Sequence, residues 1–311
     1  MAEKVTLSVI VPVYNEEEVI KESYKRLTEV LESSGESYEL IFVNDGSRDK
    51  TIILAKEIAE KDRRVKIIDF ARNFGHQIAI TAGMDNACGD AVVVIDADLQ
   101  DPPEVILEML KKWREGYEIV YGKRVKREGE TFFKKFTAKV FYRFLDSMTD
   151  VQIPVDTGDF RLIDRKVCDS MRKISEHNRY VRGIVSWLGY KSTPVEFERH
   201  ARFAGTTKYP LKKMIKFASD AIMSFSYKPL KLASVLGIIT DLAAVVMLII
   251  FAILKMLDLS SVLSLVTLFM VCIMMLVLGI IGEYVGRIYD EAKDRPLYIT
   301  RDMINFEDSE G

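Results

Sequence analysis

The chain has 311 residues, of which 49% are hydrophobic, and a formal net charge of −2 at pH 7. This length accommodates one large domain or two ordinary ones, and the nearly balanced charge gives no reason to expect a nucleic-acid partner. Cys88, Cys168 and Cys272 lie far apart and form no metal-ligand spacing, which argues against a disulfide framework and indicates a reducing compartment.

Strand-like and helix-like segments alternate along the first half of the chain. Continuous apolar runs rich in β-branched residues predict buried strands at 6–13, 38–44, 65–70, 91–95 and 118–121. Helices are expected after the first three strands, reaching about residues 32, 61 and 87. This alternation predicts an α/β fold with a doubly wound, mostly parallel sheet. Residues 1–4 carry no apolar signal core, so we expect this domain to stay in the cytoplasm.

Polar residues gather where these strands end. Asp45, Arg72, Asp96 and Asp98 lie at or just beyond predicted strand ends, the edge at which ligands bind in such sheets. The Asp-Gly-Ser sequence that begins at Asp45 is by itself an ordinary turn, but three strand ends with such residues favour a site. Neither the G-x-G-x-x-G nor the P-loop fingerprint occurs in the sequence, so a nucleotide has to be held differently.

Asp96 and Asp98 offer a way to hold a nucleotide. Residues i and i+2 at a strand end point to the same side, and two carboxylates suit Mg²⁺ or Mn²⁺, which prefer oxygen ligands. A metal held there can bridge to a diphosphate and stabilise it as a leaving group. An isolated Asp-x-Asp is a weak signal, but this one ends a buried strand and is followed by Leu-Gln-Asp-Pro-Pro-Glu.

Five motifs, in this order along the chain, resemble glycosyltransferase family 2, and its polyprenyl-phosphate glycosyltransferases in particular. They are VPVYNE at 11–16, VNDGS at 43–47, RNFG at 72–75, DADLQDPPE at 96–104 and GDFRL at 158–162. The resemblance covers residues 5–210, and the apolar C-terminal part matches as well. It implies a GT-A fold (Rossmann-like), a nucleotide-diphosphate sugar as donor, a polyprenyl phosphate such as undecaprenyl phosphate as acceptor, and inversion at the anomeric carbon.

The resemblance also implies roles for single residues. The donor is expected to contact residues from four of the motifs: Pro12, Tyr14, Glu16, Asp45, Arg72, Asp96 and Gln100. Among these, Gln100 is expected to face the sugar. Asp98, together with Asp96, is expected to hold the metal and the diphosphate.

On the acceptor side, Asp159 matches the residue that the family usually treats as the catalytic base. A phosphate monoester has its second pKa near 6 and is mostly ionised at pH 7, so a base is less needed than in transfer to a hydroxyl. Asp159 could instead orient the acceptor or complete the metal site, and the nearby Asp156 is a weaker candidate. The resemblance thus implies three catalytic residues: Asp159, Asp98 and Arg202.

A basic segment follows at 199–208. Its three cations match a loop that closes over the lipid phosphate and the diphosphate: Arg199, Arg202 and Lys208. Composition alone fits a solvated loop, but arginine can grip phosphate bidentately, and Gly205 gives the loop freedom to move. The three histidines share no spacing and are interpreted as ordinary residues, with a weak case for the third near the phosphates: His76, His177 and His200.

Two further segments point to a membrane. Residues 131–148 form a basic amphipathic pattern that packs on the sheet or lies at the membrane surface. Residues 232–254 and 262–281 are apolar runs long enough to cross a bilayer. Lysine and arginine flank their outer ends, which places both flanks in the cytoplasm. Asp241 lies inside the first run, an expensive position for a carboxylate.

We therefore expect a cytoplasmic GT-A catalytic domain at 1–209, an interfacial helix at 210–230, a two-helix transmembrane anchor at 231–286 and a cytoplasmic C-terminal tail at 287–311, which from residue 296 is a short acidic extension. The favoured function is transfer of one sugar to polyprenyl phosphate at the cytoplasmic face of the membrane. UDP-glucose is the first choice of donor and UDP-N-acetylglucosamine the second. A processive polysaccharide synthase and an inactive membrane scaffold are the alternatives, and a homo-oligomer is possible.

Overall fold

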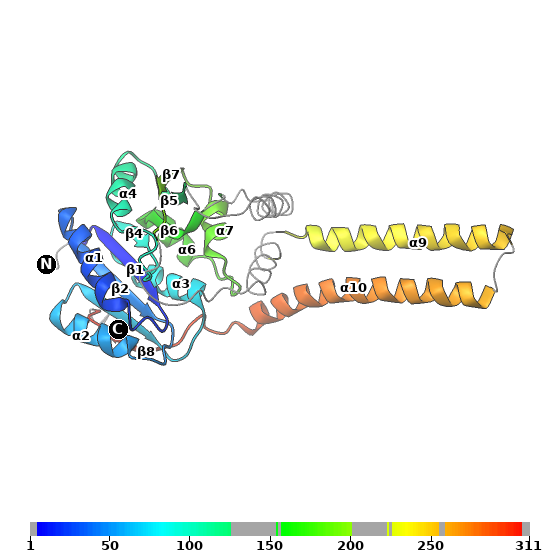
Figure 1. Cartoon of the computed structure of the whole chain (residues 1–311), viewed down its shortest axis with the longest axis horizontal. Helices are drawn as coiled ribbons and strands as arrows, with labels where there is room; N and C mark the ends of the chain where they lie inside the picture. Colours follow the sequence, from blue (N-terminus) through cyan, green and yellow to red (C-terminus); the bar gives the residue numbers. More distant parts are fainter. Residues whose placement is uncertain are drawn as a thin grey trace.

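The computed structural model describes residues 5–125, 154, 157–200, 223, 226–254 and 259–306. The strands and helices alternate through the first half of the chain (Figure 1). The elements are β1 Leu7–Val13, α1 Ile20–Ser33, β2 Tyr38–Asn44, α2 Thr51–Lys61, β3 Val65–Phe70, α3 His76–Asn86, β4 Ala91–Val94, α4 Val105–Arg114, β5 Ile119–Arg124, β6 Thr157–Asp164, α6 Arg165–Arg172, α7 Val181–Trp187, β7 Ser192–Phe197, α9 Lys228–Leu254, α10 Leu259–Lys293 and β8 Thr300–Ile304.

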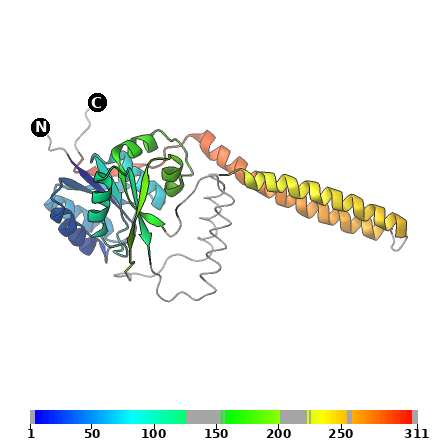
Figure 2. The same ribbon diagram turned by 90° about the horizontal axis from the view of Figure 1, so that it is seen from above.

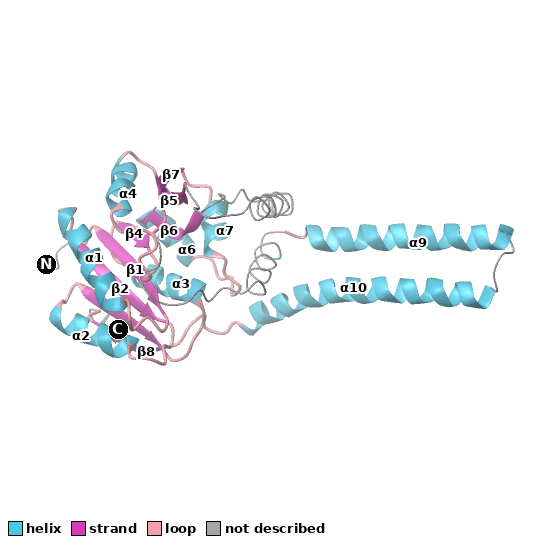
Figure 3. Ribbon diagram, viewed as in Figure 1, coloured by secondary structure: helices cyan, strands magenta, loops and turns pink. Residues whose placement is uncertain are grey.

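In the part of the chain that the structure describes, one sheet contains eight strands in the order β7-β5-β6-β4-β1-β2-β3-β8 (Figure 3). The strand β1 pairs in parallel with β2 and β4, and β2 pairs in parallel with β3. The strand β6 runs antiparallel to both β4 and β5. The predicted α/β fold with a mostly parallel sheet is confirmed. Strand order reverses at β1, so the crevice between β1 and β4 is the expected ligand position.

Helices cover both faces of this sheet, which explains why its central strands are apolar without alternation. Every residue of β1 and β2 is buried. One hydrophobic cluster joins the sheet to α1, α2 and α4, and a second joins the opposite face to α3, α6 and α7. The helix α3 lies so close to β1 that a Cβ atom at Gly83 would lie 2.3 Å from Ile10 Cγ2. This packing fixes the start of α3 at the carboxyl edge of the sheet.

The helices α9 and α10 form a hairpin that projects from the α/β domain, and they run side by side in both views (Figures 1 and 2). Within the described residues, two helices are long and apolar enough to cross a membrane, at Lys228–Met247 and Val266–Lys293. Their apolar windows are 12% and 0% buried, so neither is packed as a core helix would be. The predicted spans at 232–254 and 262–281 lie within α9 and α10.

The helices extend beyond the predicted boundaries. The helix α9 begins at Lys228, inside the segment predicted as an interfacial helix, and the helix predicted at 131–148 lies outside the described residues. The helix α10 continues to Lys293, past the predicted end of the anchor at residue 286. Tyr284 Oη donates a hydrogen bond of 2.7 Å to the carbonyl oxygen of Ser226, which ties α10 to the segment before α9.

The tail after α10 differs from the predicted acidic extension. Its strand β8 pairs antiparallel with β3, and the described chain therefore returns to the α/β domain (Figure 1). Without β8, the outer edge of β3 would expose unpaired backbone groups. Side chains reinforce the pairing, because Tyr298 stacks on Phe70 with ring centroids 5.2 Å apart and Lys56 Nζ lies 2.8 Å from Asp302 Oδ2.

This returning strand is expected to stabilise the catalytic domain. Replacing Tyr298 with Ala removes the stacking on Phe70 and the hydrogen bonds of its hydroxyl with Asp85 and Asn86. We expect a loss of about 1–3 kcal/mol, measured as a lower thermal midpoint of the detergent-solubilised full-length protein. Ile299→Ala is the matched control, since Ile299 is 56% exposed and its truncation should leave the midpoint nearly unchanged. An equal effect of the two substitutions would contradict the role of Tyr298.

Candidate active site

The carboxyl ends of the central strands open into a cavity of about 610 Å³, a volume typical of ligand pockets. The order of the strands arranges its acidic residues in a row. Asp45 follows β2, Asp96 and Asp98 follow β4, and Asp159 lies near the start of β6, with β1 and Tyr14 between the first two. Neighbouring strands lie about 4.8 Å apart, so this row is roughly 14 Å long. Its shape suits an elongated ligand.

Asp45 fixes one end of the cavity. Its carboxylate accepts hydrogen bonds from Asn73 Nδ2 at 2.9 Å and from the backbone N–H groups of Phe74 at 2.6 Å and Gly75 at 3.0 Å. Burial raises the pKa of Asp45, while these backbone donors act in the opposite direction. Asp45 therefore holds the loop between β3 and α3 against the cavity as well as lining the cavity itself.

Asp96 and Asp98 occupy the middle of the row. Asp98 is 9% exposed, and its Oδ1 accepts a 3.1 Å hydrogen bond from the Gln100 N–H. Burial raises the pKa of Asp96, His76 acts in the opposite direction, and the negative charges of Asp159 and Asp98 raise this pKa further. Carboxylates crowded in this way are stabilised by a cation.

This pair fits a divalent metal with an incomplete protein shell. Among the described residues, no group of three or more His, Cys, Asp or Glu side chains is arranged to hold a metal. Mg²⁺ is usually bound through one or two carboxylates, with substrate phosphates and water completing the octahedron. Asp96 and Asp98 can supply those carboxylates, so the remaining ligands would have to come from the substrate and from water.

His76, the first residue of α3, lies between two carboxylates. Its Nε2 is 3.5 Å from Asp96 Oδ1 and 3.3 Å from Asp159 Oδ2. Burial lowers the pKa of this imidazole, but the hydrogen bond to Asp159 and the two negative charges outweigh burial and raise the pKa of His76 to about 9. The interpretation of His76 as an ordinary residue is wrong, because His76 lines the cavity between Asp96 and Asp159.

Both carboxylate oxygens of Asp159 face cationic or donor groups. Oδ2 accepts a hydrogen bond from Gln77 Nε2 at 3.2 Å, and Oδ1 lies 3.0 Å from Arg182 Nε. Burial alone would raise the pKa of Asp159, but Arg182 and His76 hold this pKa well below its usual range. A carboxylate stabilised so strongly as an anion is a weak proton acceptor, so the geometry favours a positioning role.

Asp101 does not line the cavity but contacts Arg124, which does. It is buried, and its Oδ2 lies 3.2 Å from Arg124 Nη2 while its Oδ1 lies 3.3 Å from Arg199 Nε. The next residue, His200, donates its backbone N–H to the Gln100 carbonyl oxygen at 2.9 Å. The start of the predicted basic loop is therefore anchored to the segment that carries the Asp96–Asp98 pair.

The structure brings seven of the predicted site residues around this cavity: Pro12, Tyr14, Glu16, Asp45, Asp96, Asp98 and Asp159. Arg72 and Gln100 are not among the residues that line it. The guanidinium of Arg72 lies 4.1 Å from the centroid of the Phe74 ring, and Nη1 donates to the Asn73 carbonyl oxygen. Three further candidates lie outside the described residues: Asp156, Arg202 and Lys208.

Sequence reasoning missed three cationic residues of the lining: His76, Arg124 and Arg182. His76 follows the RNFG motif directly, and this position was the one available signal for it. Arg124 ends β5 and Arg182 lies in α7, and neither belongs to a motif that the sequence marks. Pairing of β5 with β6 brings Arg124 next to Gly158, and α7 brings Arg182 to Asp159.

Substitution of Asp45 tests its part in the site. Asp45→Ala leaves the N–H groups of Phe74 and Gly75 without their acceptor, which is expected to destabilise the protein by about 1–3 kcal/mol and to weaken nucleotide binding about tenfold. Thermal unfolding and titration with a nucleoside diphosphate measure these effects. Asp169→Asn, on the exposed face of α6, is the control. Unchanged nucleotide affinity in Asp45→Ala would contradict this placement of the nucleotide.

The GT-A architecture, with an aspartate pair at the carboxyl edge of its sheet, defines the class of protein as a glycosyltransferase. The chain belongs to glycosyl transferase family 2, whose sequence model matches residues 8–172.

Relatives match along nearly the whole chain. The chain is 58% identical over 312 residues to the uncharacterised glycosyltransferase YkcC of Bacillus subtilis, covering 99% of this chain and 97% of that protein. It is 38% identical to a prophage bactoprenol glucosyl transferase homologue of Escherichia coli (95% and 98% covered) and 37% identical to the bactoprenol glucosyl transferase of Shigella phage SfII (95% and 97%). Mannosyl-3-phosphoglycerate synthase from Rubrobacter xylanophilus matches with a TM-score of 0.48 at 15% identity, over 70% of this chain and 72% of that one.

Proposed function

We propose that this glycosyltransferase moves one sugar from a nucleotide-diphosphate sugar, with UDP-glucose as first choice, to a polyprenyl phosphate such as undecaprenyl phosphate. The product is a lipid-linked sugar for glycosylation of the cell envelope. The observation that carries this proposal is the combination, in one chain, of the row of acidic residues in the cavity with two helices able to cross a membrane. The relatives named as bactoprenol glucosyl transferases support the same acceptor.

The donor is proposed to lie along the row of strand ends. Its nucleoside contacts Pro12, Tyr14, Glu16 and Asp45, and its diphosphate lies at the aspartates that follow β4. Arg72 and Gln100 enter this proposal only as residues of segments that border the cavity, since neither lines it.

Mg²⁺ or Mn²⁺ is proposed to bind Asp98 and Asp96. When bound, a divalent cation neutralises the diphosphate and stabilises it as a leaving group. The chain itself fixes Asp98 through the Gln100 N–H and sets a cation, His76, beside Asp96. Removal of divalent ions with a chelator is therefore expected to stop turnover, and addition of Mg²⁺ or Mn²⁺ to restore it.

The acceptor is proposed to reach the cavity from the membrane. The hairpin of α9 and α10 anchors the protein with the catalytic domain and both termini on the cytoplasmic side, as the flanking lysines and arginines favour. The three cations of the segment at 199–208 are proposed to bind the phosphates. Arg199 pairs with Asp101, which also contacts the cavity residue Arg124. Arg202 and Lys208 belong to the same proposal.

In the proposed reaction, an oxygen of the acceptor phosphate attacks the anomeric carbon from the side opposite the diphosphate. The new carbon–oxygen bond forms as the bond to the nucleoside diphosphate breaks, so the anomeric configuration inverts. The attacking oxygen is already ionised near neutral pH, and Asp159 orients the groups around it and takes no proton.

A donor panel tests this proposal. The full-length protein is incubated with Mg²⁺ or Mn²⁺, undecaprenyl phosphate and one radiolabelled nucleotide sugar at a time, and the products are extracted with organic solvent. We expect label in the organic phase with UDP-glucose, and UDP-N-acetylglucosamine is the second donor to compare. Label in an insoluble polymer would favour a processive synthase. Label that stays in water for every donor would favour a membrane scaffold.

A further inference from the structure

The end of the cavity near β6 carries more positive than negative charge. Among the described residues that line this end, Arg124 and Arg182 are cationic and Asp159 is anionic. Two further arginines lie next to this lining: Arg161 contacts the backbone of Asp159, and Arg199 pairs with Asp101. The lining therefore carries a formal surplus of one positive charge at one end of a cavity whose other end is acidic. Such an end is complementary to an anion that arrives in addition to the donor.

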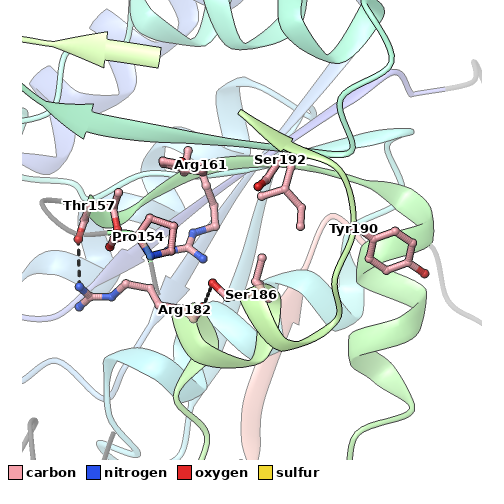
Figure 4. A pocket seen from close by; sticks show the side chains of 10 residues that line it. Pro154, Thr157, Arg161, Arg182, Ser186, Tyr190 and Ser192 are labelled. Atoms are coloured by element: carbon pink, nitrogen blue, oxygen red, sulfur yellow. Dashed lines mark hydrogen bonds between the residues drawn. The ribbon is translucent and has the colours of Figure 1, made fainter. Parts of the chain in front are cut away.

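Among these arginines, Arg182 lies between two pockets. It lines the large cavity and also a second pocket of about 80 Å³ (Figure 4). The described residues that line this second pocket include Arg161 but no carboxylate. Asp159 Oδ1 lies 3.0 Å from Arg182 Nε, and Arg182 Nη1 donates to the Thr157 carbonyl oxygen at 3.1 Å. These contacts hold the guanidinium at the cavity wall.

The backbone of Gly158 and Asp159, next to Arg182, is held by hydrogen bonds from Arg161. Arg161 is 5% exposed, and its Nη2 donates to the Gly158 carbonyl oxygen at 2.9 Å while its Nε donates to the Asp159 carbonyl oxygen at 3.3 Å. On the cavity side, a Cβ atom at Gly158 would lie 2.7 Å from Arg124 Nη2. The start of β6 therefore lies between Arg161 and Arg124. Its backbone is fixed there, and so is the carboxylate of Asp159 that contacts Arg182.

We propose that Arg182 binds the phosphate of the acceptor, a phosphate monoester dianion, and that Asp159 is the positioning residue that holds its guanidinium in place. This proposal rests on the function proposed above. A phosphate monoester carries about −1.5 to −2 charges near pH 7, which cationic lining residues can offset, and arginine offers paired donors to phosphate oxygens. With the diphosphate proposed at Asp96 and Asp98, an oxygen attacking from the opposite side approaches from β6, where Asp159 Oδ1 lies 3.0 Å from Arg182 Nε.

Equilibrium binding tests this subsite without turnover. Undecaprenyl phosphate is titrated into the full-length protein in detergent, in the absence of any nucleotide sugar. The variants are Arg182→Gln, Arg182→Lys and, as a matched control, Arg114→Gln, an exposed arginine of α4 paired with Glu36. We expect Arg182→Gln to weaken lipid binding at least about tenfold. Arg182→Lys should have an affinity between those of Arg182→Gln and the wild type, because lysine keeps the charge but lacks the paired donors of the guanidinium. Arg114→Gln should bind the lipid as the wild type does. Inorganic phosphate should displace the lipid from the wild type at millimolar concentration, if the phosphate group alone is recognised.

Steady-state rates separate this subsite from a structural effect. Arg182→Gln is expected to raise the KM for undecaprenyl phosphate and to leave the KM for the nucleotide sugar within about twofold of wild type. Unchanged lipid binding in Arg182→Gln, or an equal rise in both KM values, would overturn the proposal. If the wild type binds the lipid through Arg182 yet forms no lipid-linked sugar, the proposed function fails and the subsite stands. If Arg182→Gln does not fold, judged by thermal unfolding, Arg182→Lys carries the test.

Discussion

Asp98→Asn is expected to lower kcat by at least about a thousandfold, the scale of losing charge stabilisation at a leaving group. The Asn side chain keeps an Oδ1 that can accept the hydrogen bond from the Gln100 N–H, so the turn after β4 is retained while the negative charge is removed. The expected loss therefore reports on cation and diphosphate binding and not on folding. Turnover, the concentration of Mg²⁺ or Mn²⁺ for half-activation and the thermal midpoint measure these effects.

The control for this experiment is Asp169→Asn. Asp169 is 49% exposed on α6 and pairs with Arg172 at 2.9 Å, so its neutralisation should leave both turnover and metal activation within about twofold of wild type. A variant Asp98→Asn that retained wild-type turnover, or that lost its fold, would contradict the role given to Asp98.

Asp159→Asn is expected to reduce kcat/KM for the acceptor about a hundredfold, while the acidic limb of the pH–rate profile stays that of the wild type. Arg182 and His76 hold the pKa of Asp159 well below its usual range. A depressed pKa means that the charge of Asp159 is fully present above the ordinary value near 4 and is lost only at lower pH. Between about pH 5 and 8 this carboxylate does not titrate, and the acceptor phosphate, with its second pKa near 6, sets the acidic limb.

The measurement is kcat/KM for undecaprenyl phosphate from pH 5 to 8 in the wild type and in Asp159→Asn. An acidic limb at the same pH in both profiles is the expected result. At higher pH the two profiles differ, because Asp159→Asn removes the contact that raises the pKa of His76. A general base would impose its own limb on the wild-type profile, and that limb would disappear in the variant. Disappearance of the acidic limb in Asp159→Asn would therefore show that Asp159 accepts the proton.

The sequence predicted the parts of the fold that depend on local pattern. The strands at 38–44 and 65–70 match β2 and β3 residue for residue, because both are buried and their apolar runs end at polar turn residues. The strands β6, β7 and β8 were not predicted. In β7 and β8, exposed and partly buried residues are mixed, and β8 forms only because the long hairpin returns its chain to the free edge of β3.

The candidate site was predictable to the extent that its residues follow strand ends. Asp45, Asp96 and Asp98 lie at such ends and meet in one cavity. His76 and Arg182 reach the same cavity from the first turns of α3 and α7, positions set by helix packing on the sheet and not by a local pattern. The strong pKa shifts of Asp159 and His76 arise from these contacts. The amino-acid sequence alone does not show which charged side chains become neighbours in the fold.

The nucleotide released in the reaction tests the central claim most directly. Attack of the lipid phosphate on the anomeric carbon leaves both donor phosphates on the nucleoside, so each turnover with UDP-glucose should release one UDP and yield a lipid phosphate carrying one sugar. Chromatography of the aqueous phase and mass spectrometry of the organic phase measure both products in the same sample. Release of UDP in equal amount to a singly glycosylated lipid phosphate is the predicted result. Release of UMP with a lipid diphosphate sugar would contradict the account, because the sugar phosphate would then have been transferred.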